Sequence, residues 1–286
     1  MKKSTFFKSA SLALACAAAA TAFSGCGSKN YAENNTAFFI GASGPLTGSA
    51  ASYGIAVQRG AELAVEEINA KNEDGMRFTF EIKDDKASAA DVPTNFAALY
   101  EKGMQLSLGA VTSGACLSFK GLAAEKNLFT LCPSATADDV TKDADTVFQM
   151  CFSDSNQGSV AAQQYFNTDA VPAGTKLGIL YCSNDAYSKG IYDTFKAALD
   201  TSKFAEVAET SFRNDASGNP PTDMNSQVET LKNCSYFFMP VYYTPAVTFM
   251  LAAKGKIASD AVYFGCDGFD GIDTSVKDFD IHTVTQ

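Results

Sequence analysis

Short apolar segments with strand character alternate with amphipathic helical segments along most of this 286-residue chain. In the first half, the pattern predicts strands at residues 37–41, 77–82, 105–111, 128–132 and 147–152, and helices at 54–69, 87–102 and 114–126. Most of these strands are followed by a helix long enough to return the chain, so neighbouring strands are expected to run parallel. The sequence therefore predicts an α/β fold whose parallel sheets are flanked by helices.

The alternation restarts after residue 153. It predicts helices at 156–167, 189–201, 224–233 and 246–254, and strands at 176–182, 206–212, 235–241 and 261–266. Two successive α/β sets predict two lobes, residues 37–150 and 151–286, joined by a hinge at 147–153. The loops at the carboxyl ends of the strands are expected to face a cleft, where open α/β sheets bind ligands.

The first residues have the composition of an export signal. Three lysines precede an Ala/Leu-rich apolar run at residues 9–22, which is shorter than the roughly 20 residues needed to span a bilayer. Small residues follow and end at Cys26, so residues 1–25 are predicted to be a secretory signal peptide. The end of this segment resembles a bacterial lipoprotein signal cut before Cys26, which implies lipid attachment there and a short tether at 26–36. An uncleaved membrane anchor and a plain cleavable signal are the alternatives.

Composition excludes several classes of partner. The net charge is −10 and the lysines are scattered, so the chain has no basic stripe for nucleic acid. At 46% hydrophobic residues it has enough apolar side chains for a substantial core.

Six cysteines follow Cys26, and most lie in apolar runs without CxxC spacing. An exported protein permits disulfides, but buried free cysteine behaves as a small hydrophobic residue, and mostly free thiols are predicted. His282 is the only histidine, which argues against a zinc site.

Two motifs suggest a dinucleotide enzyme. The glycine-rich stretch 41–48 follows the first strand, and the acidic pair 84–85 follows the second, as in a dinucleotide fold. Tyr192 and Lys196 form a YxxxK pair, as in short-chain dehydrogenases. However, the proline within the glycine-rich stretch removes a backbone donor, and YxxxK is also the ordinary i, i+4 spacing of a helix. We therefore reject this interpretation.

Other enzyme motifs are missing from the sequence. It contains no GK[ST] phosphate loop and no GxSxG elbow, and a histidine-based triad would depend on His282 alone. We therefore predict a protein that is not an enzyme and needs no cofactor or metal. A secreted hydrolase is the alternative of a different class.

Residues 41–72 resemble the opening of the branched-chain amino-acid-binding family. Further matching segments follow in the same order at 82–88, 108–116, 132–141, 147–158, 179–190 and 263–271. These proteins are extracytoplasmic solute-binding components of ABC importers with the two-lobe, type I periplasmic-binding-protein fold. The resemblance implies a small amino acid, branched-chain or similar, as ligand and a membrane ABC permease as partner. A signalling receptor is the alternative partner.

The resemblance also implies roles for single residues. Ser113 matches the serine that holds the ligand's carboxylate, and Ser134 and Thr136 match neighbouring contacts. Hydroxyls and backbone N–H groups at a helix start suit a carboxylate on physical grounds. The alternative is that these serines are ordinary helix caps.

The other matched positions complete a cleft for a zwitterion. Asp267 matches the acidic residue that meets the ligand's ammonium, with Asp in place of the longer Glu. Tyr53 and Tyr187 match aromatic walls, one from each lobe, and Tyr242 or Tyr243 lies near a further wall position. The alternative is that Asp267 belongs only to a turn, and Asp154 is expected to be a helix cap or crossover contact.

The chain ends soon after Asp267. In the family, the chain is at this point close to its next crossing back into the first lobe. The C-terminal part of lobe 1 is therefore expected to be missing, leaving apolar surface uncovered, and weak ligand binding is expected as a result.

Overall fold

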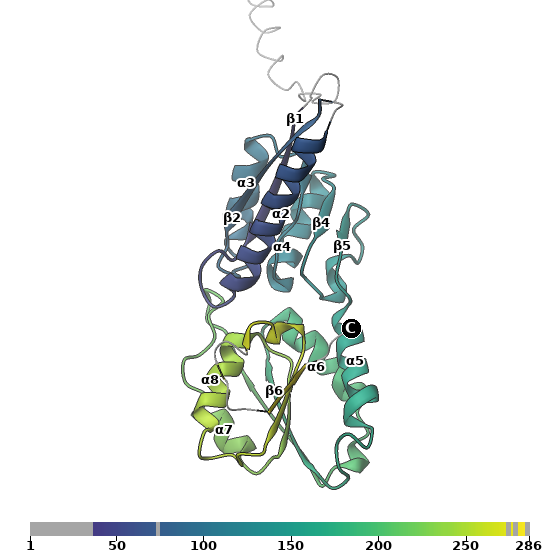
Figure 1. Cartoon of the computed structure of the whole chain (residues 1–286), viewed down its shortest axis with the longest axis vertical. Coiled ribbons are helices and arrows are strands. Elements are labelled where there is room, and N and C mark those ends of the chain that lie inside the picture. The colour runs from purple at the N-terminus through teal and green to yellow at the C-terminus, as the bar shows by residue number, and fades with distance from the viewer. Residues whose placement is uncertain (1–36, 73–74, 273–275, 277–279, 284–286) are drawn as a thin grey trace, which may run out of the picture. The chain divides into compact units, whose positions relative to one another are not determined.

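Two five-stranded sheets, both wholly parallel, organise the described part of the chain (Figure 1). The computed structural model describes residues 37–72, 75–272, 276 and 280–283. The predicted signal peptide, the tether and Cys26 lie outside these residues. The strand orders are β2-β1-β3-β4-β5 and β10-β9-β8-β6-β7, so the predicted α/β architecture with helix-flanked parallel sheets is confirmed.

The first sheet and its helices, here called the N-terminal lobe, follow the predicted order. Its strands are β1 (Ala37–Gly44), β2 (Arg77–Asp84), β3 (Leu106–Ser107), β4 (Thr130–Cys132) and β5 (Val147–Gln149). Its helices are α2 (Ala51–Lys71), α3 (Val92–Glu101) and α4 (Ser113–Glu125), with a short 3-10 helix at Asp138–Val140.

The second sheet and its helices form the C-terminal lobe. Its strands are β6 (Lys176–Cys182), β7 (Glu206–Phe212), β8 (Tyr236–Met239), β9 (Val262–Gly265) and β10 (Asp280–Thr283). Its helices are α5 (Asp154–Ala161), which continues as a π-helical turn (Ala162–Phe166), α6 (Ala186–Ala198), α7 (Asn225–Leu231) and α8 (Tyr243–Ala253). Single 3-10 turns lie at Thr201–Lys203 and Asp267–Phe269.

Side chains of the second sheet alternate between two cores, as the two-residue period of a strand requires. Phe237 and Tyr263 point to the face covered by α7 and α8. Phe238 and Phe264 point to the opposite face, covered by α5 and α6. Burying each large apolar side chain contributes about 1.5–3 kcal/mol, so this doubly covered sheet is a rigid support for the loops at its strand ends.

The two faces of the first sheet are covered unequally. α3 and α4 pack a continuous core that includes Phe96 and Phe119. On α2, only Gly54 is buried, while Leu63 and Ile68 are 57% and 49% exposed. The expected exposure of apolar side chains in this lobe is therefore observed among the described residues.

Differences from the predicted elements have local causes. β3 is shorter than the predicted strand 105–111 because Gly109 adopts a left-handed φ of 64° and turns the chain toward α4. α3 begins five residues later than predicted because Lys86 and Ala87, also with positive φ, form a turn before it. β10, a short polar strand paired with β9, is not predicted from its own residues.

The six cysteines of the described chain are free thiols, as predicted. Most are buried, and burial raises the pKa of Cys182 and Cys234 to about 11. None of the helices in the described part of the chain is both long enough and apolar enough to cross a membrane.

Candidate ligand-binding site

A small cavity is lined by residues that follow the carboxyl ends of strands from both sheets. Its empty space, part of which is open to solvent, is about 290 Å³. Its lining comes from the segments after β1, β3 and β4 in the N-terminal lobe and after β6, β8 and β9 in the C-terminal lobe: Tyr53, Val111, Thr112, Ser113, Ser134, Ala135, Thr136, Tyr187, Tyr242, Asp267 and Gly268. This is where parallel α/β sheets place ligands.

The start of α4 supplies hydrogen-bond donors to one side of the cavity. Ser113 is the first residue of this helix, and Thr112 is the N-cap, whose side chain makes no capping hydrogen bond. The buried Ser113 Oγ accepts hydrogen bonds from the backbone N–H groups of Thr136 and Ala137, each at 3.2 Å. Because both contacts use the oxygen as acceptor, the hydroxyl proton remains available to donate. With the unpaired first N–H groups of α4, it forms a site suited to an anion.

The opposite side of the cavity presents a carboxylate. Tyr187 Oη donates a 2.6 Å hydrogen bond to Asp267 Oδ1, and the Gly268 backbone N–H donates to Tyr187 Oη at 2.8 Å. The Asp267 backbone N–H donates to Gln157 Oε1 at 3.2 Å. Gly268 has no room for a side chain, since a Cβ there would lie 2.6 Å from Tyr187 Oη and 2.9 Å from the Val241 carbonyl.

These surroundings make the Asp267 carboxylate unusually basic. Burial raises its pKa. The hydrogen bonds that involve the side chains of Tyr187 and Gln157 lower the pKa, but they offset the effect of burial only in part. Burial and the nearby Asp267 charge also raise the pKa of Tyr187. The residues that line this cavity include no lysine, arginine or histidine, so a cation of a ligand would be the partner that favours the ionised form of Asp267.

Three tyrosines form the cavity wall. Tyr242 stacks on Tyr187 with a centroid separation of 4.8 Å and an interplanar angle of 16°, and Tyr53 lies 5.7 Å from Tyr242. Tyr53 Oη donates to the Gly268 carbonyl at 2.6 Å. Thr244 Oγ1 donates to the Ser49 carbonyl at 2.7 Å. Both hydrogen bonds connect the N-terminal lobe with the C-terminal lobe.

All six predicted ligand-binding residues line this one cavity: Tyr53, Ser113, Ser134, Thr136, Tyr187 and Asp267. Their roles toward a ligand remain predictions. Tyr242, rather than Tyr243, completes the wall, which resolves the ambiguity between these neighbours.

Several contributors to the site are not predicted from the sequence, among them Thr112 and Gln157. Thr112 was overlooked although it directly precedes Ser113 at the end of the same loop. Gln157, on α5, is remote from every strand end and had no local signal. Asp154 is not the cap of α5, since Ser153 Oγ accepts from the Asn156 N–H. It is a crossover contact, because its buried backbone N–H donates to the Thr136 carbonyl at 2.8 Å.

The rejected dinucleotide motifs have structural explanations. The N–H groups of Leu46 and Thr47 in the glycine-rich loop donate to Asp84 Oδ1 at 2.9 and 3.3 Å, so a carboxylate of the chain itself occupies them. Lys196 forms an ion pair with Glu209 at 2.9 Å. The YxxxK spacing therefore reflects contacts between α6 and β7.

Comparison with known proteins agrees with this geometry. The sequence model of a family described as periplasmic binding protein matches residues 37–255. The chain belongs to the periplasmic binding protein family.

Among the relatives of this periplasmic binding protein, the Leu/Ile/Val-binding protein BraC3 of Rhizobium johnstonii is 31% identical over 234 residues. That match covers 80% of this chain and 61% of the relative. A Leu/Ile/Val-binding protein homologue of Brucella melitensis is 30% identical over 170 residues, which cover 59% of this chain and 45% of the relative. The chain thus spans about half to three fifths of the length of these curated relatives.

Solved structures show the same fold. The branched-chain amino acid transporter substrate-binding protein LivJ of Streptococcus pneumoniae, in complex with isoleucine, aligns with a TM-score of 0.71 at 28% identity. The alignment covers 84% of this chain and 68% of LivJ. The leucine-binding protein LivK of Thermotoga maritima aligns with a TM-score of 0.73 at 20% identity, covering 84% and 67%. The predicted type I fold is therefore confirmed, and the family and fold are those of extracytoplasmic bacterial solute-binding proteins.

Proposed function

We propose that this periplasmic binding protein binds a free amino acid between its two lobes and presents it to an ABC permease, with no catalytic step. Ser113, Ser134 and Thr136 hold the ligand's carboxylate, and Asp267 holds its ammonium. Tyr53 and Tyr187 enclose the ligand from the two lobes. The relatives named for leucine, isoleucine and valine binding support this substrate class.

One observation carries the proposal: the two sides of the cavity have opposite chemistry. The start of α4 offers N–H and O–H donors, while Asp267 offers a buried carboxylate without a cationic partner among the lining residues. A zwitterion satisfies both sides at once, with charge-assisted hydrogen bonds at each end. A simple anion would leave Asp267 unpaired, which is costly in a buried site.

The division of the site between lobes favours capture by hinge closure. A ligand held by Ser113 and Asp267 contacts both lobes only when they are closed, so binding shifts the population toward that state. The hydrogen bonds Tyr53–Gly268 and Thr244–Ser49 support the same closed arrangement. The proposed hinge lies at residues 147–153, where β5 leads into α5 (Figure 1).

Attachment to the membrane through a lipid on Cys26 is part of this proposal. A tethered binding protein stays close to its permease instead of diffusing away. The Cys26→Ala variant should therefore move from the membrane fraction to the soluble fraction of bacterial cells. An unchanged distribution would contradict lipid attachment at this residue.

Calorimetry with blocked ligands tests the binding mode. A free amino acid that binds should lose its affinity when its amine is acetylated, because Asp267 then faces no cation. It should also lose affinity when its carboxylate is converted to an amide, because the start of α4 then faces no anion. Benzoate, an anion without an amine, should not bind. Tight binding of either blocked compound would contradict the proposed zwitterion site.

A further inference from the structure

A second cavity adjoins the first. Its empty space, part of which is open to solvent, is about 390 Å³, and it shares Thr112 and Tyr242 with the proposed zwitterion site. Like the first cavity, it is lined by segments that follow strand ends in both lobes, including Asp185 after β6 and Asn214 after β7. The two cavities are therefore neighbours that share part of their walls.

The second cavity has one acidic side chain among its lining residues and no lysine, arginine or histidine. Asp185 is the N-cap of α6, and its Oδ1 accepts a 2.9 Å hydrogen bond from the Ser188 N–H. Within the described chain, no hydrogen bond or ion pair is found for its other oxygen, Oδ2. Burial raises the pKa of Asp185 to about 6, and the only opposing influence is the Ser188 hydrogen bond. The carboxylate is thus mostly ionised at pH 7, and no cationic side chain of the described residues lines the cavity beside it.

A second polar group at this cavity also lacks a partner. Thr112 is 6% exposed, and its Oγ1 has no hydrogen-bond partner among the described residues. Buried hydroxyls are rarely left unsatisfied, because the desolvation cost is then not recovered. The Tyr242 ring and two prolines, Pro220 and Pro245, supply apolar surface in the same cavity. The lining therefore combines apolar surface that suits an aliphatic stem with the polar groups of Asp185 and Thr112.

From this juxtaposition we propose that the second cavity is a side-chain subsite for a cationic amino acid, with Asp185 receiving the terminal ammonium or guanidinium and Tyr242 packing on the stem. The inference rests on the proposed amino-acid function and narrows its substrate class. It places lysine, ornithine or arginine, rather than leucine, isoleucine or valine, as the preferred ligand. Tyr242 lines both cavities and stacks on Tyr187, which donates a hydrogen bond to Asp267.

The test compares lysine with norleucine, which has the same carbon chain without the terminal ammonium. Calorimetry on the full chain at pH 7 should show lysine binding at least about 30-fold more tightly, as expected for a close charge pair in a binding site. Asp185→Asn keeps a good N-cap for α6 but removes the charge. This variant should lose at least about tenfold in lysine affinity while norleucine affinity stays unchanged or rises.

Asp200→Asn is the matched control. Asp200 caps the 3-10 turn Thr201–Lys203 through the Ser202 N–H and does not line either cavity, so its substitution should leave both affinities unchanged. Tighter binding of norleucine than lysine by the wild-type chain would overturn the subsite, as would equal losses for both ligands in Asp185→Asn. In both cases the zwitterion site would survive. If neither lysine, norleucine nor leucine binds the wild-type chain, the proposed amino-acid function itself fails.

Discussion

Replacing Asp267 by Asn tests the ammonium site with almost no change in shape. Tyr187 Oη already donates to one oxygen of Asp267 at 2.6 Å, so the carboxylate has a second oxygen left for a ligand. An Asn that keeps its oxygen toward Tyr187 presents its NH₂ group to the ligand's ammonium. The variant therefore loses both the charge and the acceptor. Truncating one member of a buried charge pair costs about 2–5 kcal/mol, which corresponds to a roughly 30- to 3,000-fold loss of affinity.

The same substitution should have the opposite effect on the stability of the ligand-free protein. Burial raises the pKa of Asp267 above its ordinary value of 3.8. The folded state then binds the proton more tightly than the unfolded state, so this residue lowers the free energy of unfolding as pH rises above that ordinary value. Asn carries no charge at any of these pH values. Asp267→Asn should therefore be at least as stable as wild type at pH 7.

Calorimetry with the ligand that binds wild type most tightly, combined with urea unfolding at pH 7, measures both effects. Asp270→Asn, an exposed change three residues away, is the control and should leave affinity and stability unaltered. Unchanged affinity in Asp267→Asn would refute the ammonium role. A loss of affinity accompanied by a large loss of stability would show that Asp267 acts mainly in folding.

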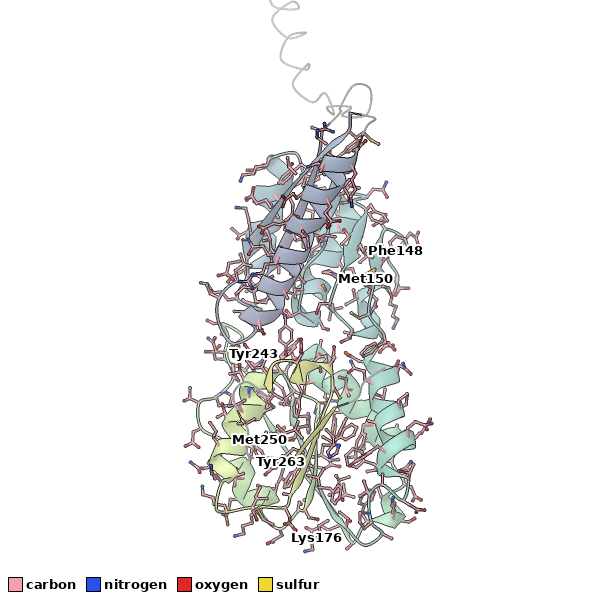
Figure 2. The ribbon with its side chains drawn as sticks, viewed as in Figure 1. Phe148, Met150, Lys176, Tyr243, Met250 and Tyr263 are labelled. Atoms are coloured by element: carbon pink, nitrogen blue, oxygen red, sulfur yellow. The ribbon has the colours of Figure 1, made fainter. Side chains whose placement is uncertain are left out.

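Three further predictions concern other parts of the molecule. Ser113→Ala should lower the free energy of unfolding by about 1–3 kcal/mol in urea titrations. The reason is that the Thr136 N–H, which donates to Ser113 Oγ, becomes a buried donor without an acceptor. An unchanged urea midpoint would contradict this prediction. Asp154 is buried, its pKa is raised to about 8 by burial, and its oxygens lack hydrogen-bond partners within the described chain. The free energy of unfolding of the wild type should thus fall as pH rises from about 4 to about 8. In Asp154→Asn this dependence on pH should be flatter, and the variant should be the more stable protein at pH 8. Parallel pH profiles for the two proteins would refute the raised pKa of Asp154. Phe148 and Met150 are 47% and 68% exposed at the β5 edge (Figure 2), and this apolar surface should promote self-association of the chain. Changing both residues to Ser should therefore lower the sedimentation coefficient measured at high protein concentration. If the sedimentation coefficients of wild type and variant depend on concentration in the same way, the β5 edge is excluded as the surface of self-association.

Much of the fold is encoded locally. The strands 176–182 and 206–212 are predicted with the observed bounds. The first is a nearly continuous apolar run, and both are followed directly by polar residues that mark their ends. β10 is different, since its residues carry no apolar pattern and the strand exists only through its pairing with β9. Where backbone pairing rather than side-chain pattern defines a strand, local sequence carries too little signal to find it.

The sequence by itself determined the parallel α/β architecture and identified the strand ends at which a ligand site lies, because periodicity and loop position are properties of neighbouring residues. It also identified Ser113 and Asp267 as candidates through their resemblance to a family pattern. Only the tertiary structure decided that Tyr242 rather than Tyr243 faces the cavity and that Asp185 and Thr112 share a second one. Those residues come from strand ends in different lobes, so their burial, lost hydration and missing partners arise only when the chain brings the two sheets together.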